Sequence, residues 1–113
     1  MANNVFVTPL FDSKRKRLSR KFPSINSDLF ILEDELKANP QKGTSLGANL
    51  YKVRVANTDK QSGKSRGYRV ISYLVEQTLK STDIYLITIY DKSEESTILK
   101  SDLVKMVSKI FGK

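Results

Sequence analysis

The chain has 113 residues, of which 39% are hydrophobic, and this length and composition suit one domain over residues 1–113 with a core of its own. It contains no cysteine and no histidine, which excludes disulfide bonds, the usual zinc and copper sites, and catalysis by a histidine base or a cysteine nucleophile. Twenty Lys and Arg residues against twelve Asp and Glu residues give a formal net charge of +8 at pH 7, a balance that favours polyanionic partners.

The first predicted elements are a short strand over residues 4–7 and a basic helix after it. Thr8 followed by Pro9 is typical of a helix start, with the threonine as N-cap. The helix has a narrow apolar face with residues at spacings of seven and four: Phe11, Leu18 and Phe22. Residues 14–21 hold six cations and no acid: Lys14, Arg15, Lys16, Arg17, Arg20 and Lys21. We expect this helix to present a strongly basic surface.

A second helix is predicted after the break at Pro23, with Ser24 as its N-cap. Its apolar stripe advances by four, three and four residues: Ile25, Leu29, Leu32 and Leu36. Asn39 followed by Pro40 ends it. Because the connection between the two helices is very short, we expect them to form an antiparallel hairpin.

Three strands and a last helix are predicted after a loop over residues 40–49. The strands cover residues 50–56, 68–75 and 84–90, with a long polar loop over 57–67 and a turn at Thr82-Asp83. Short connections make this meander antiparallel. The last helix spans 98–111, with Ser96 or Thr97 as candidate N-cap and with apolar residues at helical spacing: Leu99, Leu103, Met106, Val107 and Ile110.

The fold class is therefore predicted to be α+β in the order β-α-α-β-β-β-α, with the helical hairpin packed on a small antiparallel meander sheet. We expect the helices to cover one face of the sheet and the other face to stay partly open. No apolar run reaches the length of a membrane span, and the N-terminus lacks the pattern of a signal peptide. We therefore expect a cytoplasmic protein without a membrane partner.

The positive charge is segregated along the chain. Besides the basic helix, residues 42–69 hold seven cations and one acid, Asp59. Such a field favours nucleic acid, an acidic protein or a membrane surface as partner. The alternative is a basic surface that serves only solubility. The loop cations Lys60, Lys64 and Arg66 and the cations of the first helix are the candidate RNA-binding or ribosome-binding residues.

Arg69 is a charge inside an apolar strand, where burial is costly unless the charge is paired. Lys52 and Arg54 share one face of the preceding strand, and with a normal antiparallel register Arg69 can lie across from Arg54 or Lys52. Like charges at opposed positions destabilise a sheet, so such a cluster makes sense if a phosphate binds among them. The alternative is that Lys52 and Arg54 are solvated and that Arg69 pairs with Asp91 or Glu76.

The runs LYKVRVAN, GYRVISYLV and IYLITIYDKSE resemble the RelE/ParE superfamily of toxins from type II toxin–antitoxin systems, and most closely its RelE/HigB-like branch. The resemblance covers most of the chain and is strongest from residue 46 to residue 95. It implies a ribosome-dependent mRNA interferase that uses the 2′-OH of the RNA as nucleophile and needs no metal or other cofactor. It also implies a cognate antitoxin as partner, besides mRNA and the ribosome.

The resemblance assigns candidate catalytic positions. Lys52 and Arg54 match the paired basic residues of the family's first meander strand, Arg69 matches the arginine of Gly-Tyr-Arg, and Lys92 approximates the basic residue beyond the last strand. The family's catalytic tyrosine has no counterpart in the segment SEESTILK. Tyr90 is the candidate that could replace it.

Two alternative functions stay open at the level of sequence. One is the ParE branch of the same fold, which poisons DNA gyrase and does not cut RNA. The other is a basic RNA-binding module without enzymatic activity, in which the helix with KRKRLSRK lies on a phosphate backbone.

Overall fold

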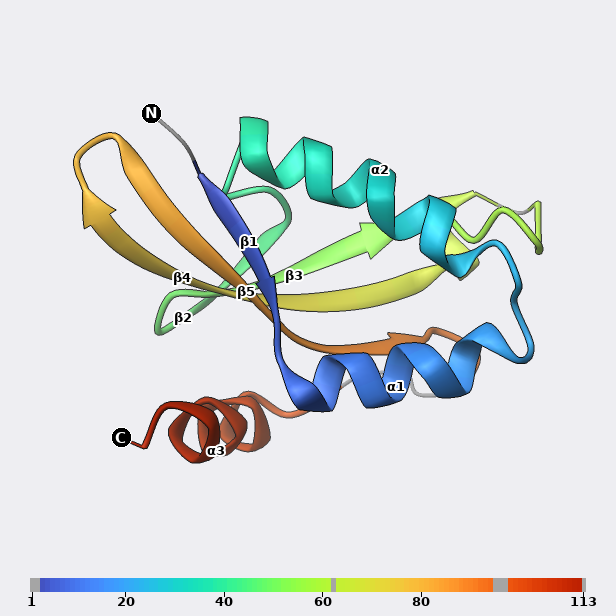
Figure 1. Ribbon diagram of the computed structural model, residues 1–113. Helices are drawn as coiled ribbons and strands as arrows, with labels where there is room; N and C mark the ends of the chain where they lie inside the picture. The colour runs from blue at the N-terminus through green and yellow to red at the C-terminus, as the bar shows by residue number, and fades with distance from the viewer. Residues whose placement is uncertain (1–2, 62, 95–97, 113) are drawn as a thin grey trace.

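The computed structural model describes residues 3–61, 63–94 and 98–112 and shows an α+β fold (Figure 1). Within these ranges the chain forms three α-helices and a five-stranded mixed sheet with strand order β1-β5-β4-β3-β2. The elements are β1 (Asn4–Val7), α1 (Pro9–Ser19), α2 (Ile25–Ala38), β2 (Thr44–Gly47), β3 (Leu50–Val55), the 3-10 turn η1 (Lys64–Arg66), β4 (Tyr68–Thr78), β5 (Ser81–Asp91) and α3 (Lys100–Phe111). The predicted fold class is confirmed.

The first two helices begin where the sequence predicts. The Thr8 hydroxyl accepts a hydrogen bond from the Phe11 amide at 3.3 Å, so it caps α1. Ser24 stands at the N-cap position of α2, but its side chain makes no bond to the helix. It donates instead to the Asp59 carboxylate in the loop after β3, at 3.0 Å. Ser24 therefore ties the start of α2 to that loop.

The sheet has one strand more than the sequence predicts. The expected loop over residues 40–49 contains β2, which pairs antiparallel with β3. Ala48 and Asn49, with φ of 53° and 63°, form the two-residue turn between them, because such a turn needs two left-handed residues. The strand was missed because it is short and mostly polar. β1 pairs in parallel with β5, which makes the sheet mixed.

The β4–β5 hairpin is longer than predicted. Its strands extend to Thr78 and start again at Ser81, so the turn lies at Leu79-Lys80 and the expected turn at residues 82–83 is wrong. The added residues are polar and largely exposed, which explains why their pattern does not resemble a buried strand. The hairpin is the long curved ribbon that projects at one end of the sheet (Figure 1).

The helices cover both faces of the sheet, which corrects the expectation of one partly open face. The helices α1 and α2 lie on one side, and α3 lies on the other side with its own core (Figure 1). On the α3 face Leu103 and Val107 pack against Leu50, Ile71 and Ile87. The candidate N-caps of the last helix, Ser96 and Thr97, lie outside the described residues.

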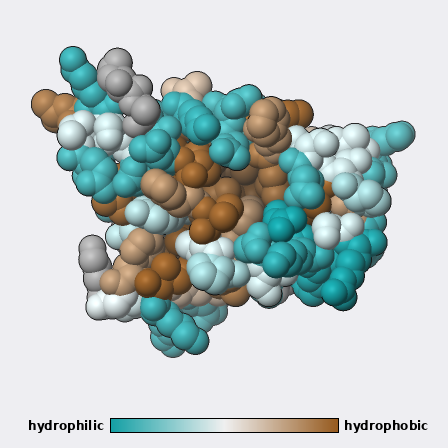
Figure 2. Space-filling model, in the orientation of Figure 1, coloured by the Kyte–Doolittle hydropathy of each residue, from teal (hydrophilic) through white to brown (hydrophobic). Residues whose placement is uncertain are grey.

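The surface divides into apolar and charged regions. In Figure 2, apolar side chains gather near the middle of the view, over β1, and hydrophilic side chains cover the C-terminal half of α1. The exposed cations there are Lys16, Arg17, Arg20 and Lys21. None of the helices in the described ranges has both the length and the apolar character that crossing a bilayer requires.

Candidate functional site

A row of three candidate side chains crosses the three central strands of the sheet, β3, β4 and β5. Arg54 of β3 lies directly opposite Arg69 of β4, and Arg69 lies directly opposite Tyr90 of β5. Residues opposed in this way point to the same face, which is the α3 face. Lys52 shares that face, two residues before Arg54 and opposite Ile71. The predicted cluster of Lys52, Arg54 and Arg69 on one face is therefore the observed arrangement.

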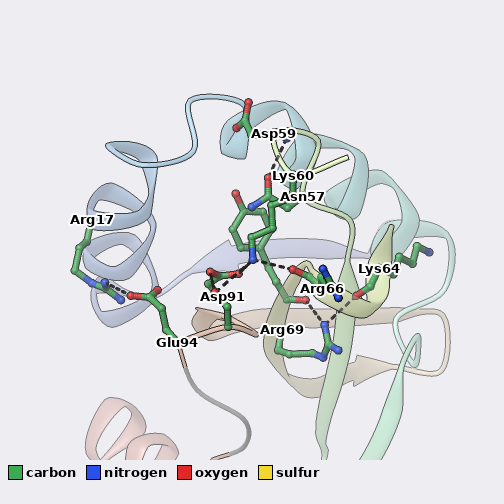
Figure 3. A network of polar contacts seen from close by, with 11 residues as sticks. Arg17, Asn57, Asp59, Lys60, Lys64, Arg66, Arg69, Asp91 and Glu94 are labelled. Atoms are coloured by element: carbon green, nitrogen blue, oxygen red, sulfur yellow. Dashed lines mark hydrogen bonds and ion pairs between the residues drawn. The ribbon is translucent and has the colours of Figure 1, made fainter. Parts of the chain in front are cut away.

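The members of this row differ in exposure. Arg54 is exposed and Lys52 is half-buried, whereas Arg69 is only 5% exposed and Tyr90 only 3%. The Arg69 guanidinium donates to the backbone carbonyls of Lys64 at 3.0 Å and Tyr68 at 3.2 Å (Figure 3). Burial and then the charge of Arg54 lower the pKa of Arg69, while Tyr90 acts in the opposite direction. Arg69 thus supplies a positive charge from a poorly solvated position behind Arg54.

Neither carboxylate predicted as a partner of Arg69 lies opposite it in the sheet. Asp91 lies opposite Tyr68, hence on the other face of the sheet, and its ion pair is with Lys60, at 2.6 Å. Glu76 is an exposed residue seven positions further along β4, opposite Thr82. The strand register therefore favours the shared cationic face over a pairing of Arg69 with either acid.

Gly67 allows the backbone at the start of β4 to lie very close to the end of β3, two residues before Arg69. A Cβ atom at this position would lie 1.9 Å from the Val55 carbonyl oxygen, far inside van der Waals contact. The Gly67 carbonyl also accepts a hydrogen bond from the Lys92 amide at 3.1 Å, which fixes the backbone just beyond β5. The glycine of Gly-Tyr-Arg is needed for close approach, and it helps to place Lys92.

The tyrosine of Gly-Tyr-Arg does not belong to the row. Tyr68 is fully buried on the α1–α2 face, edge-on to Phe22 with ring centroids 5.9 Å apart. Burial, and then the nearby carboxylates of which Asp28 contributes most, raise the pKa of Tyr68 far above its ordinary value. A phenol held neutral in the core cannot act as a base. Tyr90 is the tyrosine that lies directly opposite Arg69.

The polar loop of residues 57–67 is held by side-chain bonds (Figure 3). The Asn57 side chain accepts from the Asp59 amide at 3.0 Å, and Asp28 of α2 accepts from both the amide and the hydroxyl of Thr58. Lys60 reaches across to Asp91 at the end of β5. The loop is therefore anchored to α2 and to the sheet at once.

The predicted RNA-binding cations fall into two regions. Lys60, Arg66 and Lys92, together with Ser93, line an open depression of about 580 Å³ at the strand ends, and the Lys64 side chain points outward from η1 (Figure 3). On α1 several cations already have acidic or polar partners. Arg15 donates to Asp12 at 2.7 Å and to Asn26 at 3.0 Å, Lys16 lies 3.4 Å from Asp12, and Arg17 pairs with Glu94 at 3.1 Å.

The remaining cations of the basic helix are Lys14, which is half-buried, and Arg20 and Lys21, which are exposed near its C-terminal end. The Lys21 ammonium also lies 5.4 Å from the centroid of the Phe22 ring. Nothing in the described ranges groups three Asp or Glu residues as a metal site would.

Comparison with known proteins gives a match in structure and none in sequence. No family model matches the chain, and no curated protein matches its sequence. Among solved structures it matches an arginine-to-alanine double mutant of the E. coli toxin RelE in the free state, with a TM-score of 0.61. The chain has a RelE-like fold. The match covers 97% of this chain and 99% of that chain at 14% sequence identity, so it confirms the resemblance at the level of fold.

One part of the site was not foreseen. The sequence places Lys60 among RNA-binding residues and Asp91 as a partner for Arg69, whereas the structure joins these two side chains to each other. They are separated by 31 residues, and no spacing rule links them. No local signal in the sequence could have revealed this pair.

Proposed function

We propose that this protein is the toxin of a type II toxin–antitoxin module and that it cleaves translated mRNA at the ribosome in the cytoplasm, without a metal. The observation that carries the proposal is the row Arg54–Arg69–Tyr90, with Lys52 beside it, on a RelE-like fold. Two opposed arginines are unfavourable in a sheet unless an anion binds near them. A phosphodiester is an anion that matches the planar guanidinium fork.

The proposed reaction is an internal transfer within the RNA. The 2′-oxygen attacks the adjacent phosphorus, a 2′,3′-cyclic phosphate forms, and the bond from phosphorus to the 5′-oxygen breaks. The 2′-OH gives up a proton and the leaving 5′-oxygen takes one, so the protein must supply a base, an acid and charge stabilisation. No external nucleophile is consumed.

The residues of the row suit these tasks differently. Arg54 is exposed and binds the phosphate directly, while Arg69 stabilises the developing charge from behind it. Lys52 is the candidate proton donor or acceptor on the same face. Tyr90 is the second candidate for proton transfer or base stacking, and Lys92 lies just beyond the strand end. A site with so few acid–base groups suits an enzyme that depends on the ribosome to position its substrate.

The basic surfaces outside the row are proposed to hold the ribosome and the antitoxin. The proposed contacts to ribosomal RNA phosphates are the exposed Arg20 and Lys21 at the end of α1 and Lys64 and Arg66 on η1. The other candidate residues for this contact are Lys14, Arg15 and Arg17, whereas the predicted contact Lys60 is occupied by its ion pair with Asp91. An acidic antitoxin would neutralise the toxin by covering these cations and the row, acting both sterically and electrostatically.

The proposal is tested by expressing the chain alone and mapping the 5′ ends of transcripts, with and without active translation. We expect growth arrest and new 5′ ends inside translated messages, and we expect Arg69→Ala to abolish both. Lys80→Ala on the tip of the β4–β5 hairpin is the matched control, because it removes one exposed cation far from the row and should leave the toxin active.

Three results would contradict the proposal. Full growth inhibition and cleavage by Arg69→Ala would remove the row from the mechanism. DNA damage with intact transcripts would identify a gyrase poison of the same fold. Salt-sensitive RNA binding without cleavage or growth arrest would identify a binding module.

A further inference from the structure

The Lys60 ammonium sits at the junction of three parts of the molecule. It lies 2.6 Å from the Asp91 carboxylate, 2.9 Å from the Arg66 carbonyl and 3.5 Å from the Ser93 hydroxyl. It also lies 5.4 Å from the centroid of the Phe22 ring, at the connection between α1 and α2. An ammonium has three N–H donors, so these oxygen contacts account for its hydrogen-bonding capacity. Lys60 is therefore built into the protein and is poorly suited to bind RNA directly.

Its contact with Arg66 leads to the functional row. Arg66 is the last residue of η1, and η1 also provides the Lys64 carbonyl that accepts from the Arg69 guanidinium at 3.0 Å. The three residues of η1 lie between Gly63, which has φ of +73°, and Gly67. A single 3-10 turn between two glycines has little rigidity of its own. The bond from Lys60 to Arg66 attaches this turn to the sheet.

Asp91, which binds Lys60 from the end of β5, is a firm anchor for this connection. Asp91 has a fully buried carboxylate, at 0% exposed, and it follows Tyr90 directly in β5. A buried carboxylate that lost its cation would be costly, so the pair holds together strongly. Figure 3 shows the resulting chain of contacts, from Asp91 through Lys60 and Arg66 to Lys64 and Arg69.

We propose that Lys60 and Asp91 form a positioning pair: they fix η1, and η1 fixes the Arg69 guanidinium behind Arg54, where it stabilises a bound RNA phosphate. This inference rests on the proposed function, because it assigns the pair a role through the phosphate-binding row. Arginine has many rotamers, and a guanidinium that is already oriented loses less freedom when the anion arrives. Neither member of the pair touches the RNA.

The sign of the charge change separates positioning from simple electrostatics. Lys60→Met removes a positive charge, and Asp91→Asn removes a negative one. If only the overall field mattered, the first change would weaken RNA binding and the second would strengthen it. If the pair positions Arg69, both changes weaken binding, because each one releases η1. Lys60→Arg keeps the cation and should retain most of the affinity.

The test is a double-mutant cycle on RNA affinity, with a fluorescent single-stranded RNA whose riboses carry 2′-O-methyl groups so that it cannot be cleaved. We expect Lys60→Met and Asp91→Asn each to weaken binding about 5-fold in the parent chain and less than about 2-fold when Arg69 is already Gln. Lys80→Met is the control, with little effect in either background. Circular dichroism checks that each variant is folded. If Lys60→Met does not fold, Asp91→Asn, which keeps the shape of the side chain, carries the test alone.

Each result decides a different point. Equal losses in both backgrounds, or tighter binding by Asp91→Asn, would overturn the positioning role while leaving the RNA site intact. If Arg69→Gln alone had no effect on affinity, the proposed function of the row would fail, and the positioning role would fail with it.

Discussion

Arg54→Gln is expected to move the stability of the protein and its affinity for RNA in opposite directions. Arg54 and Arg69 are directly opposed on neighbouring antiparallel strands. Like charges at such positions destabilise a sheet by roughly 0.2–1 kcal/mol. Because the Arg54 side chain is exposed, water screens much of the repulsion, and we expect the free energy of unfolding to rise by about 0.5 kcal/mol. The opposed Arg54–Arg69 pair is thus expected to cost stability unless an anion binds near it.

The stability assay is urea unfolding at two salt concentrations. A gain of this size would raise the urea midpoint by roughly 0.3 M. The Debye length falls from about 10 Å at 0.1 M salt to about 3 Å at 1 M, so the gain should disappear at high salt. Lys80→Gln removes the same charge from an exposed position near the hairpin turn and should show a smaller gain at low salt.

RNA binding by the same variants supplies the second half of the test. Each phosphate contact to a single strand contributes about 0.7 to the slope of log affinity against log salt. We expect Arg54→Gln to bind more weakly at low salt and to lose about that much slope, and Lys80→Gln to keep the slope. A destabilised Arg54→Gln, or a gain that persists at 1 M salt, would refute the repulsion. An unchanged RNA affinity would refute the phosphate contact.

Three other substitutions test, by denaturant unfolding, the residues that hold the candidate site in place. Gly67→Ala should cost about 3 kcal/mol or more, because its Cβ would lie 1.9 Å from the Val55 carbonyl oxygen; a cost under about 0.5 kcal/mol would contradict the close approach. Leu103→Ala should cost about 2–5 kcal/mol, since this side chain joins α3 to the sheet; a negligible cost would mean that α3 does not seal that face. Burial opposes the charge of Asp91, but the hydrogen bond from Lys60 helps to lower the pKa of Asp91. Its contribution to stability is therefore present above the unfolded pKa of about 3.9 and is lost as the pH falls through the lower folded value, so Asp91→Asn should lose less stability than the parent between pH 5 and pH 2. Equal losses would contradict that assignment.

The cationic residues of the row could be predicted to share one face because successive side chains of a strand always point to opposite faces of the sheet. Lys52 and Arg54 are two residues apart, so they must share a face, and antiparallel pairing then limits where Arg69 can lie. The cores of α1 and α2 followed from the same kind of reasoning with the helical period. These features depend only on neighbours in sequence and on the standard geometry of each element.

Other features depend on where elements meet, and local patterns do not contain that information. The apolar stripe of α3 shows that the helix packs on something, but not which face of the sheet it covers. The strand β2 depends on the turn at Ala48-Asn49, which pairs it with β3. Neither of these two turn residues is glycine, the residue that usually marks such a turn in a sequence. The pairing of Lys60 with Asp91 is decided only when a loop folds back across the sheet.

The alternation of β5 explains how the site and its support fit into so small a protein. Tyr90 and Asp91 are consecutive, so they point to opposite faces: Tyr90 joins the row opposite Arg69, and Asp91 pairs with Lys60 behind it. The repulsion between Arg54 and Arg69 would favour movement of either side chain away from the other. Arg54 is exposed, whereas Arg69 donates to the Lys64 carbonyl of η1 and to the Tyr68 carbonyl. In the proposed arrangement, the bond from Lys60 to Arg66 helps to keep the η1 carbonyl in place. A phosphate that binds to Arg54 would then meet one exposed guanidinium directly and one buried guanidinium nearby, and it would relieve the repulsion between them as it binds.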